Sequence, residues 1–298
     1  MVAITTIDRR NSSEILKLHN RRVENEFLVI RSKSRIDPTI LLFLCSAKII
    51  ELDKIRVGAV SYLNTKPYIW GLQHSRIMDQ IDLLIDYPSR IAAGLIKGDL
   101  DVGLVPVAVI PHLQNYTFVG DYGIACDGEV ASVALFSEVP LGEIKTILLD
   151  YQSRTSVALL KILLRKHWKT EPDLIDVKEE FQDRIQGSTA GLVIGDRALE
   201  IRSKYPYVYD LGLAWKQMTG LPFVFAAWVS VKPLDAAFVK EFSEACALGV
   251  GHLDALGRGS HLASYNLHEY YTKNIHFYID DAKKSGMRKF WGFLSEFQ

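Results

Sequence analysis

The sequence predicts an α/β protein of two lobes, with a ligand cleft between the lobes and two crossover strands that join them. Short runs rich in β-branched residues alternate with helical patterns, and this alternation occurs twice, over residues 55–107 and again over residues 146–211. Extended apolar segments lie between the two series and after the second. Alternating strands and helices are typical of sheets covered by helices, and two such units joined by extended segments predict a hinged pair.

The first series is predicted to be a β-α-β-α-β unit. Its strands and helices are expected at Ile55–Val60, Pro67–Gln73, Ile81–Tyr87, Pro88–Lys97 and Asp101–Val107. Gly98 supplies a stop after the second helix, and Pro106 ends the third strand. The strand ends should therefore open into loops along one edge of the sheet.

The second series predicts another unit of the same kind, with elements at Thr146–Asp150, Thr155–Trp168, Gly191–Gly195, Arg197–Lys204 and Tyr207–Leu211. The candidate crossing segments are Tyr122–Asp127, Val130–Ser137 and Phe223–Val231. We expect residues 54–136 plus 231–298 to form lobe 1 and residues 137–230 to form lobe 2. Residues 1–53 are expected to be an extension that is either poorly ordered or an artefact of a start codon upstream of the true one.

The C-terminal part is predicted to be helical over Asp235–Leu248 and Lys283–Glu296. The second helix carries apolar residues on roughly one face, at Met287, Phe290, Trp291 and Leu294. Stripes of this kind usually cover a neighbouring sheet or helix, so we expect them to pack in the core.

The composition argues against several classes of function. Lys plus Arg and Asp plus Glu both number 35, so the formal net charge is zero and nothing favours nucleic acid or an anionic membrane. The three cysteines lack a CxxC spacing, which argues against disulfides or a structural zinc and fits the cytoplasm. No apolar run reaches the roughly 20 residues of a transmembrane helix. The histidines lack HExxH spacing and no glycine pattern suits nucleotide phosphates, so neither a metal nor an organic cofactor is expected.

The end of the first strand is the first candidate site. Val57–Val60 runs directly into a polar cluster, and Lys66-Pro67 suits a first helical turn. In open α/β sheets, ligands bind at such strand ends. Ser61, Tyr62 and Asn64 are therefore candidates for contact with a ligand.

The segment Ser153-Arg154-Thr155-Ser156 begins a predicted helix directly after a strand. A helix N-terminus carries partial positive charge and unpaired N–H groups, and Arg154 adds a guanidinium that matches a carboxylate. The segment therefore predicts an anion site. The alternative is an ordinary capped helix with a solvated arginine.

Three further places carry polar groups near predicted strands. Ser132 starts an extended segment and either faces the cleft or makes an ordinary hydrogen bond. Gly195-Asp196 follows a strand, where the carboxylate either caps the next helix or touches a ligand hydroxyl. Thr219-Gly220 begins a tight turn before an apolar strand, and backbone donors beside aromatic surface would suit a small cyclic ligand.

Five segments, in this order, resemble the chorismate dehydratase family of the futalosine route to menaquinone: Ser61–Asn64, Asp127–Ser132, Ser153–Ser156, Gly195-Asp196 and Thr219–Ala226. The resemblance covers about residues 54–298. It implies a fold similar to type 2 periplasmic binding proteins and a carbon–oxygen lyase (hydro-lyase) activity. In that reaction chorismate, an anionic cyclic dicarboxylate, loses water to give 3-(1-carboxyvinyloxy)benzoate without a cofactor. The resemblance also implies that Asn64 and Ser132 are active-site residues.

The chemistry of these two side chains limits their roles. An amide is not basic near neutrality and a hydroxyl needs activation, so Asn64 and Ser132 are expected to orient the substrate, assist hydroxyl departure or hold a water. The proton acceptor is left open between Asp127, Glu129 and a carboxylate of the substrate, and we favour the last. Charge that develops on the ring carboxylate is expected to meet donors at the Ser153–Ser156 helix start.

One loop departs from the pattern expected of the family. Val105-Pro106-Val107 offers no side-chain hydroxyl after the third strand. Side-chain hydrogen bonds from this loop to a substrate are therefore not expected, although its backbone groups remain candidates.

Two other functions are compatible with the predicted fold. Dihydroxynaphthoate synthase of the same pathway is expected to have a different first-strand motif and a histidine base. A transport-linked solute-binding protein would bind without catalysis and would need export, but the apolar segment Thr39–Ala47 starts too late for an ordinary signal peptide. We expect a small-molecule substrate and no nucleic-acid or membrane partner, and we leave homodimerisation open.

Overall fold

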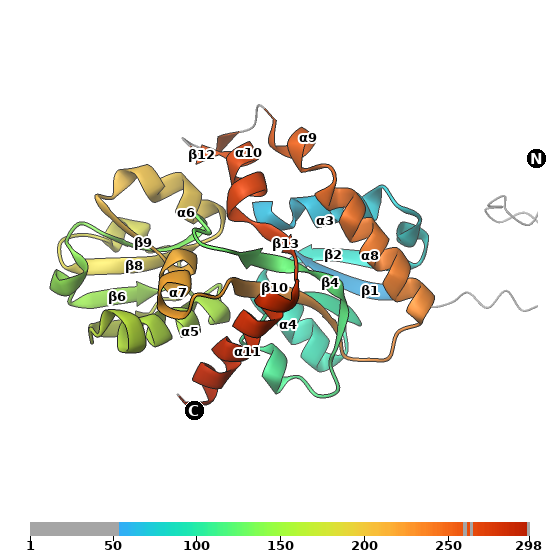
Figure 1. Ribbon diagram of the computed structural model, residues 1–298, viewed down its shortest axis with the longest axis horizontal. Coiled ribbons are helices and arrows are strands. Elements are labelled where there is room, and N and C mark those ends of the chain that lie inside the picture. The colour runs from blue at the N-terminus through green and yellow to red at the C-terminus, as the bar shows by residue number, and fades with distance from the viewer. Residues whose placement is uncertain (1–53, 259–260, 263–264, 297–298) are drawn as a thin grey trace, which may run out of the picture. The chain divides into compact units, whose positions relative to one another are not determined.

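The computed structural model describes residues 54–258, 261–262 and 265–296. Lys54–Gln298 forms one compact unit. The extension predicted for residues 1–53 lies outside the described residues. Within residues 54–298, two sheets with their helices form two lobes (Figure 1).

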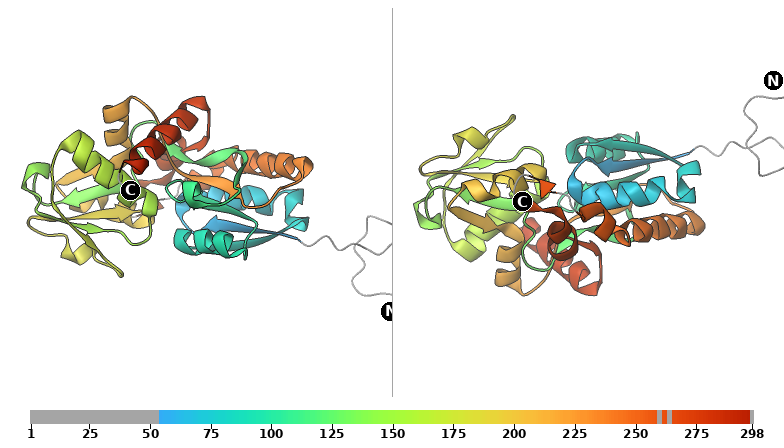
Figure 2. Two further views of the ribbon diagram at one scale, coloured as in Figure 1. Left: turned by 90° about the horizontal axis from the view of Figure 1, so that it is seen from below. Right: turned by 90° about the horizontal axis from the view of Figure 1, so that it is seen from above.

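The first sheet has six strands in the order β13-β4-β10-β3-β1-β2. Strands β1, β2 and β3 are parallel, whereas β10 runs antiparallel to both β3 and β4. Helix α4 lies on one face, and α3 lies with α8 on the other (Figure 2). The bounds are β1 Ile55–Val60, α3 Lys66–Gln73, β2 Ile81–Asp86, α4 Pro88–Lys97, β3 Val102–Pro106, β4 Thr117–Cys126, β10 Phe223–Ser230, α8 Ala236–Val250 and β13 His276–Tyr278.

Helices α3 and α8 cross with their backbones in contact. A Cβ atom built on Gly249 would lie 1.9 Å from the Pro67 carbonyl oxygen, and one built on Gly71 would lie 2.1 Å from that of Ala245. Only glycine permits this approach, because any side chain would push the helices apart. The crossing holds α3, and with it the polar turn that precedes α3, against the first sheet.

The second sheet has five strands in the order β7-β6-β8-β5-β9. Strands β7, β6 and β8 are parallel, and β5 is antiparallel to β8 and β9. Its elements are β5 Val133–Ser137, β6 Thr146–Leu149, α5 Arg154–Leu163, β7 Asp173–Asp176, β8 Thr189–Ile194, α6 Asp196–Ile201, β9 Tyr207–Asp210 and α7 Leu211–Thr219. A π-helical turn, Leu164–Trp168, continues α5.

The C-terminal part returns to the first lobe and then crosses to the second. It comprises α9 Leu253–Gly257, the small hairpin of β11 His261–Leu262 and β12 Tyr265–Asn266, α10 Leu267–Glu269, a π-helical turn Tyr270–Asn274, β13, and α11 Asp281–Ser295. Helix α11 contacts both β10 and α5 (Figure 1). Its predicted core packing is confirmed for Met287 and Phe290, which are 4% and 0% exposed, whereas Trp291 and Leu294 are half-buried. None of the helices in the described ranges is long and apolar enough to cross a membrane.

The division between the lobes differs from the predicted boundaries at two strands. β5 lies in the second sheet although the prediction placed most of it in lobe 1, and β10 lies in the first sheet although the prediction placed it in lobe 2. Both are uninterrupted apolar runs, and such a run does not indicate which sheet it joins. We therefore propose that the crossings are the connections 127–132 and 220–222.

Candidate active site

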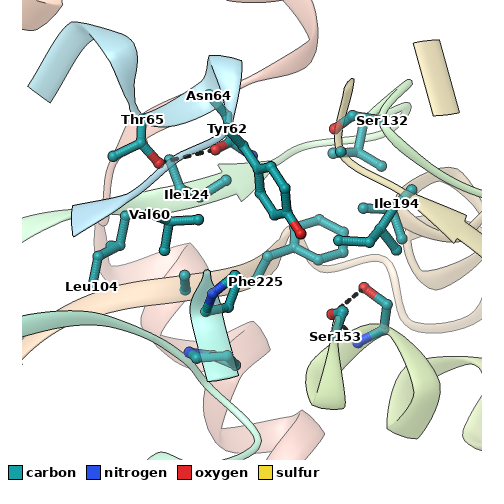
Figure 3. A pocket seen from close by; sticks show the side chains of 17 residues that line it. Val60, Tyr62, Asn64, Thr65, Leu104, Ile124, Ser132, Ser153, Ile194 and Phe225 are labelled. Atoms are coloured by element: carbon teal, nitrogen blue, oxygen red, sulfur yellow. Dashed lines mark hydrogen bonds between the residues drawn. The ribbon is translucent and has the colours of Figure 1, made fainter. Parts of the chain in front are cut away.

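A cavity lies where loops of the two lobes meet, at the ends of β1, β3, β5 and β8 (Figure 3). The space free of protein atoms is about 570 Å³, open solvent included. Figure 3 shows the Tyr62 ring in its middle, with Asn64 and Thr65 on one side and Ser132, Ile194 and Ser153 on the other. Of the residues predicted from the sequence, six line the cavity, namely Tyr62, Asn64, Ser132, Ser153, Ser156 and Gly195.

Asn64 belongs to a short 3₁₀ turn, Leu63–Thr65, between β1 and α3. Its Oδ1 atom accepts a hydrogen bond of 3.1 Å from the Thr65 hydroxyl, which leaves the Nδ2 group as the donor side of the amide. The Tyr271 hydroxyl donates to the Leu63 carbonyl oxygen at 3.0 Å and so anchors the turn. Asn64 is therefore a held, neutral hydrogen-bond donor at the cavity wall.

Ser132 is buried, with 1% of its surface exposed. Its Oγ atom accepts a hydrogen bond of 2.9 Å from the Tyr270 hydroxyl. Its carbonyl oxygen accepts one of 2.8 Å from the N–H of Gly195, so the two cavity residues are tied together. Burial raises the pKa of Tyr270, and the phenol therefore stays a donor.

The turn before Ser132 is strained and is held by a buried carboxylate. Ala131 has φ = 63°, in the left-handed region that favours glycine. The Asp210 carboxylate accepts from the N–H groups of Val130 and Ala131 at 3.1 and 2.8 Å. Arg202 donates to the Ala131 carbonyl oxygen at 3.0 Å. Burial raises the pKa of Asp210 to about 6 against the opposing effect of these N–H donors.

The start of α5 contributes two hydroxyls. Ser153 is the N-cap, its Oγ atom accepting from the Ser156 N–H at 3.1 Å while donating to the Ser156 hydroxyl at 2.8 Å. The alternative to an anion site, a capped helix with a solvated Arg154, is therefore present, and the hydroxyls of Ser153 and Ser156 also line the cavity. A helix N-terminus with such hydroxyls favours an anion.

The Tyr62 ring of the first lobe packs against the Gly195 backbone of the second. A Cβ atom built on Gly195, which has φ = 68°, would lie 3.3 Å from the Tyr62 ring. The Tyr62 hydroxyl donates to the Gln152 side chain of the second lobe. Burial raises the pKa of Tyr62, so it also remains a neutral phenol. The sequence did not predict a role for Gln152, because its partner Tyr62 is distant in the chain.

Six predicted residues lie outside the cavity lining. Ser61 and Arg154 are exposed. Thr155 uses its Oγ1 atom to accept from the Ala108 N–H at 3.2 Å. Thr219 donates back to the Trp215 carbonyl oxygen at 2.8 Å, and Gly220 ends α7 with φ = 73°. The tight turn at Gly220 was correctly located, but it ends helix α7, which the sequence analysis did not predict.

Asp196 does not have the capping role that was one of its two predicted roles. Gly195 is the N-cap of α6, and the Asp196 Oδ1 atom instead accepts from the N–H of Leu63 at 3.0 Å. Leu63 lies in the other lobe, directly beside Asn64. Asp196 is therefore a tie between the lobes.

The remaining wall is apolar. It is lined by Leu104, Ile124, Ile194 and Phe225. From the loop Val105-Pro106-Val107, which lacks the hydroxyl expected of the family, Pro106 reaches the cavity. The backbone donors of that loop are taken within the protein, since the Val107 N–H bonds the Phe225 carbonyl oxygen at 3.0 Å.

The two candidate carboxylates lie away from the cavity. Asp127 pairs with Lys216 at 2.5 Å, and Glu129 pairs with Arg202. Among the described residues, no Asp, Glu, His or Cys lines the cavity. Likewise, over residues 54–258, 261–262 and 265–296, no cluster of these types is arranged to hold a metal ion. The site therefore offers hydroxyls, an amide and a helix start.

The family model for menaquinone biosynthesis matches residues 55–296. The chain belongs to this family. Similar proteins include the chorismate dehydratase of Thermus thermophilus, 27% identical over 260 residues that cover 78% of this chain and 93% of the relative. The chorismate dehydratase of Campylobacter jejuni is 27% identical over 192 residues, which cover 62% of this chain and 72% of that protein.

Solved structures show the fold of this family member. A structural-genomics protein from Archaeoglobus fulgidus matches with a TM-score of 0.62 and 15% identity, over 82% of this chain and 97% of that one. The alkanesulfonate-binding protein of Xanthomonas axonopodis matches with a TM-score of 0.56 and 12% identity, over 82% and 92%. A Candida albicans protein with the generic periplasmic binding protein fold gives 0.55 and 13%, over 81% and 91%. The fold is that of the periplasmic binding proteins, as the sequence predicted.

Proposed function

We propose that the protein is a chorismate dehydratase, a hydro-lyase that converts chorismate into 3-(1-carboxyvinyloxy)benzoate and water. The observation that carries the proposal is the interlobe cavity of neutral donors, at which Asn64 and Ser132 meet the helix start of Ser153 and Ser156. Membership of the menaquinone biosynthesis family and relatives that are chorismate dehydratases support it. A small-molecule substrate agrees with the fold and with these relatives.

The α5 start is suited to the ring carboxylate of chorismate. The Ser156 hydroxyl, which accepts the Ser153 proton, supplies a donor, and the helix N-terminus supplies partial positive charge. Removal of the hydrogen on the ether-bearing carbon sends electron density toward that carboxylate. Donors fixed there stabilise the transition state without reorganising.

Asn64 and Ser132 act on the departing hydroxyl and on substrate orientation. The C–H bond electrons form the new ring double bond as the C–O bond breaks, and the leaving oxygen takes a proton to become water. The ring becomes aromatic, which drives the step. An amide N–H or a hydroxyl can hydrogen-bond that leaving oxygen, but neither is a base for the C–H proton.

The proton acceptor in this proposal is a carboxylate of the substrate. Asp127 and Glu129 are engaged in ion pairs outside the cavity. A substrate carboxylate is brought to the reacting carbon by binding itself, so that no protein base is required. We place the reaction in the cytoplasm, with Cys126 and Cys246 as free thiols.

The test is to incubate the purified full chain with chorismate and follow the loss of one water by mass spectrometry together with the aromatic product. Asn64→Ala and Ser132→Ala should each lower kcat by about 10²- to 10³-fold, the usual cost of one oriented donor. Ser285→Ala, on the exposed face of α11, is the matched control and should keep full activity. Tight chorismate binding without turnover would favour a solute-binding protein, and full activity of both site variants would remove them from the mechanism.

A further inference from the structure

We propose that Tyr270 is a positioning residue that directs the Ser132 hydroxyl proton into the cavity. This inference rests on the proposed function and adds a residue that lies outside the cavity lining. The Tyr270 side chain is fully buried, and its hydroxyl donates to Ser132 Oγ at 2.9 Å.

The direction of the proton follows from hydrogen-bond valence. A serine hydroxyl has one proton to donate and two lone pairs that accept. With Tyr270 donating to one lone pair, the Ser132 proton is left for another acceptor, and Ser132 lines the cavity. Tyr270 is the donor of the pair, because a phenol is more acidic than a serine hydroxyl and burial keeps it protonated. Ser132 is thereby prepared to donate to the leaving hydroxyl of a substrate.

The backbone around Tyr270 supports the same role. Tyr270–Asn274 is a π-helical turn, a local geometry that is frequent at functional sites. In the same turn, the Tyr271 hydroxyl donates to the Leu63 carbonyl oxygen at 3.0 Å, and the Asn274 amide donates to the Glu129 carbonyl oxygen at 3.2 Å. One turn therefore fastens the loop that carries Asn64 and the loop that carries Ser132. The first loop belongs to lobe 1 and the second is the proposed crossing into lobe 2, so this turn helps to hold them relative to each other.

The decisive variant is Tyr270→Phe, which removes one hydroxyl and keeps the ring. We expect kcat for chorismate to fall by roughly 10- to 100-fold, since a misdirected hydroxyl loses most of the effect of an oriented donor. KM should stay within about threefold, because the ring carboxylate site on α5 is untouched. In a Ser132→Ala background, Tyr270→Phe should cause a smaller loss than in the wild type, since only the contact of its hydroxyl with Asn64 is left to lose.

The matched control is Tyr68→Phe. Tyr68 is equally buried, and its hydroxyl donates to the carbonyl oxygens of Gly123 and Phe277 rather than to a cavity residue. This variant should lower the melting temperature and leave kcat unchanged. A Tyr270→Phe variant with wild-type kcat, or with the same loss in the Ser132→Ala background, would overturn the inference alone. A wild-type chain that does not dehydrate chorismate would overturn the proposed function, and with it the role of Tyr270.

Discussion

Removing the Asp196 carboxylate tests whether contact between the lobes limits catalysis. Its Oδ1 atom accepts from the Leu63 N–H at 3.0 Å, and Leu63 adjoins Asn64. A hydrogen bond to a charged group contributes about 1.5–3 kcal/mol. If this bond forms only when the lobes are together, Asp196→Ala destabilises the closed arrangement of the lobes relative to the open one by that free energy. At a factor of ten per roughly 1.4 kcal/mol, kcat/KM for chorismate should fall by about 10- to 150-fold.

The assay is steady-state dehydration of chorismate, with the free energy of unfolding measured in urea for every variant. Asp196→Asn keeps the acceptor oxygen without its charge and should lose roughly tenfold or less. Glu200→Ala removes an exposed carboxylate from the same helix and should leave kcat/KM unchanged. A value for Asp196→Ala within about twofold of wild type would refute the reasoning, because the tie would then contribute nothing to the reactive arrangement.

Two further predictions concern stability. Gly249→Ala should destabilise the fold by about 3 kcal/mol or more, because its Cβ would lie 1.9 Å from the Pro67 carbonyl oxygen. Gly292→Ala meets nothing within 4 Å and should stabilise the fold by roughly 0.5–1 kcal/mol. Equal free energies of unfolding in urea for the two variants would contradict this. The Asp101 pKa is about 2 where the ordinary value is 3.8, lowered by hydrogen bonds from Arg56 against the opposing effect of burial. Its contribution is therefore present above about pH 4 and lost as the pH falls through about 2, so Asp101→Asn should cost roughly 1 kcal/mol at pH 7 and close to nothing below pH 2. A pH-independent difference would rule this out.

Much of the local structure followed from local signals. The expected strand Ile55–Val60 and helix Pro88–Lys97 match β1 and α4 residue for residue. The Ser153 cap was predictable because a helix N-terminus needs an acceptor within three residues. Strand ends likewise placed Tyr62, Asn64 and Gly195 at the cavity. These features depend on neighbours in the chain, which the sequence displays directly.

Other parts depended on partners far apart in the chain. Strand β10 joins the first sheet and β5 joins the second through partners remote in sequence. The bond from Leu63 to Asp196 and the bond from Tyr270 to Ser132 also connect remote segments. A polar residue that pairs with a distant backbone group has the same local pattern as one that faces a ligand. For this reason the sequence could mark Asp196 as important but could not assign its role.

For this protein, the sequence by itself determined the alternation of strands and helices, the capped helix start and the polar strand ends, because hydrophobic periodicity and capping act over a few residues. Only the tertiary structure decided which of those polar groups share one cavity. Arg154 and the carboxylates of Asp127 and Glu129 lie outside it, while the buried Tyr270 lies directly behind Ser132. Burial and orientation are properties of the packed chain, and they leave the site with neutral donors rather than a base.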